Sequence, residues 1–110
     1  MAYDEILANR LREALSGQPK LTEKAMFGGL AFLINGNMSV AASGQGGLLL
    51  RIDPTEAERF SGEPHASRAV MGGREMDGWL RIDEAALDDE ATFTRWVERG
   101  IARSRALPPK

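Results

Sequence analysis

Asn35 and Gly36 stand between two short apolar segments, residues 30–34 and 38–42. A two-residue type I′ turn needs a positive φ angle at both central positions, and Asn-Gly is the pair most typical of that turn. The pattern therefore predicts two adjacent antiparallel strands joined by a tight hairpin. Two further apolar segments bounded by turn residues extend the prediction to four successive strands, at residues 22–27 and 48–52.

A helix is predicted on each side of these four strands. Residues 3–15 place apolar side chains at three- and four-residue spacing, and Gly17 ends the pattern. Asp53 and Pro54 are typical of a helix start, because Asp accepts N-cap hydrogen bonds and Pro lacks an N–H that would be left unpaired. We expect this second helix to be short and to end near residues 60–62.

Beyond it the chain predicts a loop, two short strands and a capped turn, at residues 63–67, 69–71, 78–82 and 83–87 respectively. A final helix is expected over about 90–106, with Asp88 or Asp89 at its N-cap. One face of this helix is apolar and is predicted to dock on the sheet, through Phe93, Trp96, Val97, Gly100, Ile101 and Leu107.

The predicted element order is α-β-β-β-β-α-β-β-α. Hairpins rather than long crossovers join the strands, so the sheet should be mainly antiparallel. The predicted fold class is therefore α+β, with two layers in which helices flank a sheet of about six short strands. A chain of 110 residues buries enough surface for one core of this kind, so residues 1–110 are expected to form one domain.

Composition excludes several classes of function. Without cysteine there is no disulfide or thiolate metal site, and one histidine, His65, is too few for most zinc sites, so no metal or other cofactor is expected. The longest apolar run, residues 30–34, is far shorter than the roughly 20 residues that span a bilayer. Charged residues near the start leave no apolar signal-peptide core. We expect a cytoplasmic protein without a membrane segment.

Two features suggest chemistry but also have simpler interpretations. Gly-Gly pairs begin at Gly28, Gly46 and Gly72, yet no phosphate-loop spacing accompanies them, and strand-end turns or bulges explain them better. His65 has Glu63 and Ser67 close by in sequence, which permits a Ser-His-acid site, although a solvated loop histidine is the favoured interpretation. The acidic residues that precede the final helix are explained by capping rather than by a metal site.

The final helix also carries a basic stripe, Arg95, Arg99 and Arg103, predicted to lie opposite its aromatic face. Such a stripe could contact phosphates or another partner, and a solvated helix face is the simpler interpretation. Because the formal net charge is −2, tight sequence-specific binding of nucleic acid is not expected. Trp79 and Trp96 are predicted to be core anchors rather than base-stacking platforms.

Apolar residues occur on both faces of two predicted strands. Residues 30–34 alternate poorly, and residues 48–50 are three consecutive leucines. If helices cover one face of the sheet, something else must cover the other. A homodimer is the simplest prediction, and a terminal segment folded back over the open face is the competing one.

One stretch of the chain carries a family resemblance. Between Lys24 and Met38 it contains Met26-Phe27-Gly28-Gly29, an apolar strand and Asn35-Gly36. Further similar segments follow at residues 49–53, 76–79 and 87–97. This arrangement resembles the N-terminal domain family of TfoX/Sxy, regulators of natural competence. The full regulators carry a second, C-terminal domain that these 110 residues do not include, so competence control itself is not carried over.

The resemblance implies an antiparallel sheet flanked by helices, a fold likened to secretion chaperones, and a regulatory rather than enzymatic role. The leading hypothesis is a non-enzymatic cytoplasmic module that acts through a protein partner in transcriptional control. The alternative is a small-molecule-binding domain or weak hydrolase that uses His65 and the glycine turns at Gly28, Gly29 and Gly72. A polar pocket at these residues favours the alternative, and an exposed apolar patch favours the first hypothesis.

Overall fold

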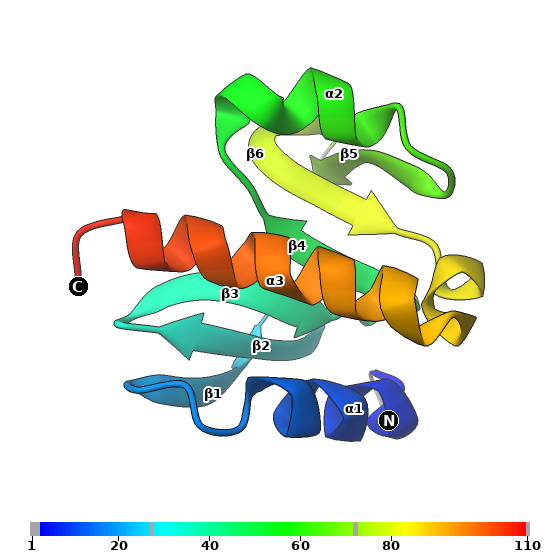
Figure 1. Ribbon diagram of the computed structural model, residues 1–110. Helices are drawn as coiled ribbons and strands as arrows, with labels where there is room; N and C mark the ends of the chain where they lie inside the picture. Colours follow the sequence, from blue (N-terminus) through cyan, green and yellow to red (C-terminus); the bar gives the residue numbers. More distant parts are fainter. Residues whose placement is uncertain (1–2, 27, 72, 110) are drawn as a thin grey trace.

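The computed structural model describes residues 3–26, 28–71 and 73–109 and has the predicted α+β architecture (Figure 1). Its antiparallel sheet has six strands in the order β1-β2-β3-β4-β6-β5. They are β1 (Leu21–Met26), β2 (Gly29–Ile34), β3 (Asn37–Ala42), β4 (Leu48–Arg51), β5 (Ala66–Met71) and β6 (Arg74–Ile82). The helical segments are α1 (Glu5–Leu15), η1 (Pro54–Glu56), α2 (Ala57–Ser61), η2 (Glu84–Asp88) and α3 (Glu90–Ala106). The predicted order of helices and strands is confirmed.

The hairpin between β2 and β3 forms as predicted. Ile34 pairs with Asn37, so only two residues make the turn. The φ angles of these turn residues, Asn35 and Gly36, are +56° and +80°. Positive φ at both positions is the condition that the Asn-Gly pair satisfies most readily.

The last two strands are longer than the sequence predicts. β5 begins at Ala66, inside the segment 63–67 that was expected to be a loop, and β6 begins well before Gly78. Ser67 is part of the sheet because it pairs with Arg81. The residues that precede Trp79 resemble a turn in sequence, but they form an irregular part of β6 where the register with β5 shifts.

All three α-helices lie on one face of the sheet (Figure 1). α3 packs across β3 and β4, α1 lies beside it, and α2 packs against β5 and β6. The largest buried side chains of this layer are Leu11, Leu15, Phe32, Ile34, Leu48, Leu50, Ile52, Leu80, Ile82, Phe93 and Trp96. The prediction that α3 docks by its aromatic face is confirmed, because Trp96 is fully buried.

Gly100 allows α3 to approach the sheet closely. A Cβ atom at this position would lie 2.7 Å from Cγ1 of Val40 and 2.9 Å from the carbonyl oxygen of Ser39. Both distances are too short for carbon in a close-packed interior. A residue other than glycine would therefore push α3 away from β3.

Aspartates cap four of the helical segments at their N-termini: Asp4, Asp53, Asp83 and Asp89. Asp89, and not Asp88, caps α3, because its carboxylate accepts hydrogen bonds from the backbone N–H and the hydroxyl of Thr92. These hydrogen bonds hold the pKa of Asp89 below its ordinary value. Hydrogen bonds from Thr55 lower the pKa of Asp53 in the same way.

The helices are short, and α3 has 17 residues. In the part of the chain that the structure describes, no helix combines the length and the apolar character that crossing a bilayer requires.

Candidate functional site

The face of the sheet opposite the helices carries a row of residues that crosses every strand. Strand register places side by side, from β1 at one edge to β5 at the other, Lys24, Ala31, Ala41, Leu49, Arg81 and Ser67. Residues paired directly across antiparallel strands project to the same face. Neighbouring positions on this face are Thr22, Met26, Leu33, Met38, Arg51, Ala69 and Trp79. We call the surface formed by these thirteen residues the open face.

The centre of the open face is apolar. A second buried cluster, distinct from the core under the helices, consists of Ala31, Met38, Ala41, Leu49 and Ala69. Ala41 is only 2% exposed although none of the described helices covers it. Larger, partly buried side chains pack around the cluster, namely Met26, Leu33 and Trp79. Three alanines therefore form part of the floor of this face, beside Met38 and Leu49, and other large side chains stand around them.

A groove with a volume of about 250 Å³ lies in this apolar centre. Met26 of β1 and Val70 of β5 both line it, although β1 and β5 are the opposite edge strands of the sheet. The sheet therefore curls toward its open side. Val70 stands at the rim with 58% of its surface exposed. We refer to this cavity as the open-face groove.

The ionisable side chains of the open face are all cationic: Lys24, Arg51 and Arg81. Among the described residues, none of the three takes part in an ion pair. Of the carboxylates of β6, Glu75 pairs with Val70 at the rim of the groove, and Asp77 lies in the irregular segment, where it approaches Arg68 at 3.9 Å. The open face therefore combines an apolar centre with unpaired positive charge.

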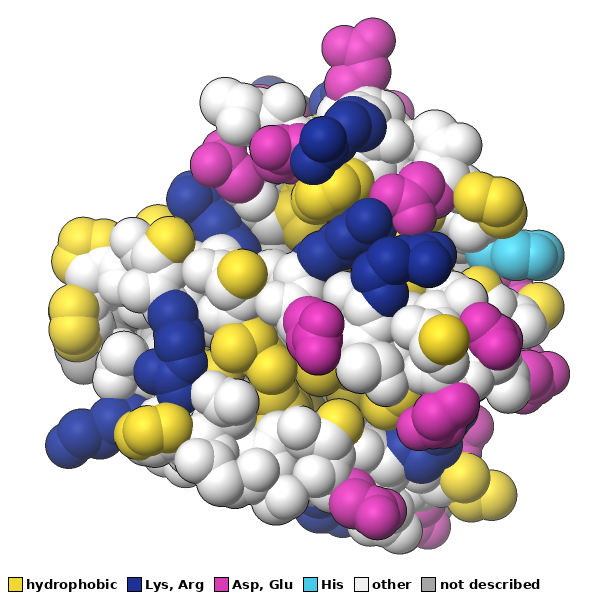
Figure 2. Space-filling view, in the orientation of Figure 1, with side chains coloured by type: hydrophobic (Ala, Val, Ile, Leu, Met, Phe, Trp, Pro, Cys, Tyr) yellow, Lys and Arg dark blue, Asp and Glu magenta, His cyan; other side chains and the backbone are white. Residues whose placement is uncertain are grey.

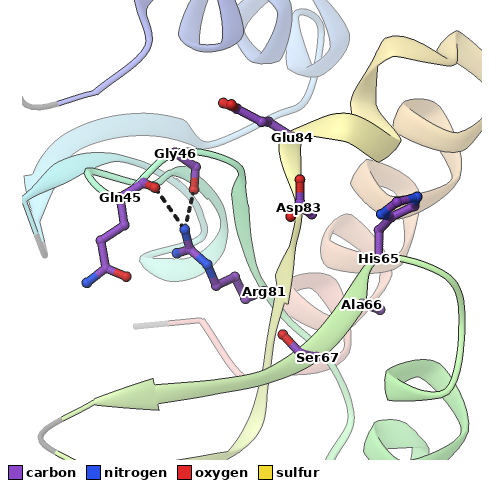
Figure 3. A pocket seen from close by; sticks show the side chains of 8 residues that line it. All are labelled: Gln45, Gly46, His65, Ala66, Ser67, Arg81, Asp83 and Glu84. Carbon is purple, nitrogen blue, oxygen red and sulfur yellow. Dashed lines mark hydrogen bonds between the residues drawn. The ribbon is translucent and has the colours of Figure 1, made fainter.

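Arg81 joins the open-face groove to a second, polar pocket of about 390 Å³. Figure 3 shows its guanidinium donating to the backbone carbonyl oxygens of Gln45 and Gly46, at 3.0 and 2.7 Å. It also donates to the hydroxyl oxygen of Ser43 at 3.0 Å. These three acceptors are neutral and fix the position of the charge without forming an ion pair.

His65 lines the polar pocket, but no Ser-His-acid site is assembled around it. In Figure 3 the His65 ring and the Ser67 hydroxyl point in different directions. Glu63 is occupied by two arginines of α3, at 3.4 and 2.7 Å. The carboxylate of Asp83 accepts a hydrogen bond from η2, which it caps. The structure thus brings His65 and Ser67 to one pocket and directs the neighbouring acids elsewhere.

Three arginines of α3 were predicted to form a basic stripe, namely Arg95, Arg99 and Arg103. In the structure they pack against α2 and η1. The Arg99 guanidinium lies 4.1 Å from the ring centroid of Phe60 and 4.6 Å from that of Trp96. It also pairs with Glu63 at 2.7 Å, and the other two arginines approach Glu63 and Asp53. The prediction that the stripe lies opposite the aromatic face is therefore wrong for Arg99. Helical periodicity does not reveal that α2 packs there.

Figure 2 views the molecule from this helix side, where positive and negative side chains are interspersed. The same face includes the ion pair between Arg12 of α1 and Glu23 of β1, at 2.9 Å. The two faces differ in whether their cations form ion pairs. On the helix side, Arg12, Arg99 and Arg103 lie next to carboxylates, whereas in the described part of the chain Lys24, Arg51 and Arg81 form no ion pair.

Trp79 is not the inward-facing core anchor that the sequence predicts. It pairs with Arg51 on the open face, where it is partly buried and packs against the second cluster. The Arg51 guanidinium lies 5.6 Å from the Trp79 ring centroid. The prediction is wrong because Trp79 alternates with Leu80, and Leu80 faces the helices. Trp96 is buried as predicted.

The family-like motif lies next to the open-face groove. Met26 and Gly29 line the groove, and Gly28 is in the turn between β1 and β2. A Cβ atom at Gly29 would overlap the carbonyl oxygen of Ala42, so strand proximity requires glycine there. Phe27 and Gly72, both singled out in the sequence, lie outside the described residues.

Sequence reasoning did not identify the three cations of the open face as a set. Lys24, Arg51 and Arg81 occur in separate segments, and only the strand register brings them to one face. A local signal was present, because each is two residues from an apolar residue of that face. Arg51, for example, follows Leu49 at this spacing, which is the period of a strand.

Comparison with known proteins gives one match. The model of the TfoX N-terminal domain family matches residues 13–104. No curated protein and no solved structure matches the chain.

Proposed function

Because the chain belongs to the TfoX N-terminal domain family, we propose that it is a regulatory interaction module. In this proposal it acts in the cytoplasm through a protein partner and contributes to transcriptional control. It carries out no catalytic step and needs no cofactor. Partner binding, rather than chemistry at a pocket, is its function.

The observation that supports this proposal is the open face. In the described part of the chain, this face of the sheet has no helix over it and offers another macromolecule a groove, an exposed Val70 at its rim and three cations without ion pairs. Apolar surface surrounded by polar groups is typical of protein interaction sites. On the helix side, by contrast, several cations are paired internally, as in the contacts of Glu63 with α3.

Photo-crosslinking in the source cell tests whether a protein docks on the open face. The photoreactive residue p-benzoylphenylalanine is placed at Thr22, which is exposed on the open face, and in a second strain at Glu98, which is exposed on α3. We expect discrete protein adducts from position 22 and not from position 98. Equal adducts from both positions, or none from position 22, would contradict the proposal.

A matched pair of variants tests the regulatory part. Val70 and Ile6 are exposed large apolar residues, and Val70 borders the open-face groove whereas Ile6 lies on α1. Cells that lack the protein are supplied with wild type, Val70→Glu or Ile6→Glu, and their transcripts are measured. We expect wild type and Ile6→Glu to restore the same transcript profile and Val70→Glu to fail. Restoration by Val70→Glu would argue against control through this face.

The polar pocket beside His65 supports a second candidate function, the binding of a small molecule. It combines Arg81, Asp83, Glu84 and Ser67 in a cavity large enough for a small ligand. A fragment screen followed by amide chemical shifts tests this candidate. Shifts confined to Ser67 and Asp83, lost in Ser67→Leu, would favour it over the interaction module.

A further inference from the structure

We infer that the open face binds an extended, acidic segment of a partner protein, with apolar side chains of that segment in the open-face groove. This inference rests on the proposed function and specifies the chemistry of the partner. Three observations carry it: the sign of the charges, the shape and composition of the groove, and the distance between the cations.

The first observation is charge complementarity. Lys24 and Arg81 stand on opposite sides of the apolar row, and Arg51 lies beside it on β4. None of them is neutralised by a carboxylate in the described part of the chain. A partner that brings carboxylates to these positions gains attraction without first breaking an internal ion pair.

The second observation is the aliphatic character of the groove. Its floor includes Ala41, Leu49 and Ala69, and its rim is formed by Met26 and Val70. The two alanines of the floor leave depth for the apolar side chains of a bound segment. Aliphatic walls suit such side chains, whereas nucleic-acid bases are bound by exposed aromatic rings. Among the described residues of the open face, the aromatic ring is that of Trp79, and it lies beneath the Arg51 guanidinium.

The third observation is length. Lys24 and Arg81 belong to one cross-strand row and are separated by four strand spacings, a path of about 19 Å. An extended chain covers that path with about six residues. A segment with acidic residues near both ends and apolar residues between them matches the row from one cation to the other.

A second copy of the chain is the competing occupant. Apolar patterning alone favours a homodimer through this face. A two-fold contact, however, would face Lys24, Arg51 and Arg81 with the same three cations. The thirteen residues of the open face include no carboxylate, and Glu75, paired with Val70 at the rim of the groove, supplies only one against three cations. Like charges placed opposite each other oppose such a contact. An acidic partner removes this repulsion.

Fluorescence anisotropy with synthetic peptides tests the inference. The probe is a fluorescein-labelled peptide of about eight residues, with glutamates at both ends and leucine and valine between them. Two control peptides replace the glutamates by lysines or the apolar residues by serines. We expect the acidic apolar probe to bind and both controls to bind at least about tenfold more weakly.

Variants assign the binding to the open face. Lys24→Gln and Arg51→Gln should each weaken binding about threefold, and the triple variant with Arg81→Gln by more than about tenfold. Arg95→Gln, on the helix side, is the charge-matched control and should change binding by less than about twofold. Because Arg81 also holds the loop between β3 and β4, the first two variants alone suffice if the triple variant unfolds.

The remaining outcomes separate this inference from its competitors. The inference is overturned if the acidic probe does not bind, or if it binds Lys24→Gln and Arg51→Gln as tightly as it binds wild type. Tighter binding of a labelled oligothymidine than of the peptide overturns it in favour of nucleic acid. Sedimentation equilibrium at micromolar concentration should give a mass near 12.0 kDa. A mass of twice that value for wild type, together with a monomer mass for Val70→Glu, overturns the inference in favour of the homodimer.

Failure of the peptide experiment leaves the proposed function separately testable. If peptides fail but position 22 still crosslinks to a protein other than the chain itself, the acidic chemistry is wrong and the interaction module stands. If position 22 forms no adducts, the interaction module fails as well.

Discussion

The two faces of the sheet are built from the same strands but differ in side-chain size and charge. The face under the helices presents large apolar side chains, such as Phe32, Leu50 and Ile82. The open face presents alanines at its centre, with Lys24 and Arg81 beyond them. Large side chains interlock with the helices, whereas small ones leave a groove. Side-chain size, and not apolarity alone, separates the face that builds the core from the face offered to a partner.

The helix-covered face should be the more sensitive to truncation, and Trp96 is its most sensitive position. Trp96 is fully buried, with the Phe60 ring edge-on at 6.1 Å between centroids. We expect Trp96→Ala to lower the free energy of unfolding by about 3–5 kcal/mol, measured by urea denaturation. Trp96→Phe should cost much less, because the buried indole N–H has no hydrogen-bond partner among the described residues. A near-wild-type midpoint for Trp96→Ala would contradict its place in the core.

Adjacent leucines of β4 compare the two faces directly. Leu50 belongs to the core under the helices, and Leu49 belongs to the cluster of the open face. We expect Leu50→Ala to cost about 3 kcal/mol, because it leaves an enclosed cavity. Leu49→Ala should cost about 1–2 kcal/mol, because its site opens into the groove. Equal losses in urea denaturation would mean that the two faces are equally packed.

Much of this architecture follows from local sequence signals. The Asn35-Gly36 turn, the Asp53-Pro54 helix start and the aromatic face of α3 are each specified by a few consecutive residues. The extent of β5 and β6 was not predictable in this way. Their polar residues resemble a loop, and Ser67 joins the sheet only because Arg81 lies opposite it. Tertiary pairing overrides local propensity there.

The candidate site was less predictable than the fold, for a related reason. Three consecutive leucines indicated that both faces of β4 are apolar. This pattern predicted that the sheet has a second apolar face besides the one under the helices. The cations of that face could be grouped only once the register of β1, β4 and β6 was known, and no single segment of the sequence encodes that register. The basic stripe of α3 was visible in the sequence, but its packing against α2 was not. Arg99, for instance, is held by Phe60 and Glu63.

Gly100 tests how tightly the helix layer is joined to the sheet. On helix propensity alone, Gly100→Ala would stabilise α3 by about 1 kcal/mol. The new methyl group would meet Cγ1 of Val40 at 2.7 Å, so we expect a net loss of about 1–3 kcal/mol instead. Ala102→Gly, at an exposed position of the same helix, should cost about 1 kcal/mol through propensity. Stabilisation by Gly100→Ala would show that α3 is not held close to β3.

The smallest expected effect concerns the start of α3. Hydrogen bonds from the backbone N–H and the hydroxyl of Thr92, at 3.1 and 2.6 Å, hold the pKa of Asp89 below its ordinary value. A carboxyl group whose pKa is lower in the folded state stabilises the fold above its unfolded pKa. That contribution is lost as the pH falls through the folded pKa, so the window lies below about pH 4.

Asp89→Asn keeps a side-chain oxygen that accepts hydrogen bonds and removes only the charge. We expect wild type to be slightly more stable than Asp89→Asn at neutral pH, with a difference that begins to shrink as the pH falls below about 4. Urea midpoints measured for both proteins from neutral pH down to about pH 3 test this. Asp88→Asn is the control, because Asp88 does not cap α3. A difference between wild type and Asp89→Asn that does not shrink between neutral pH and about pH 3 would mean that the variant acts on packing and not on charge. The cap should therefore contribute little beside the buried face of α3, since the large effects belong to the layer where the helix meets the sheet.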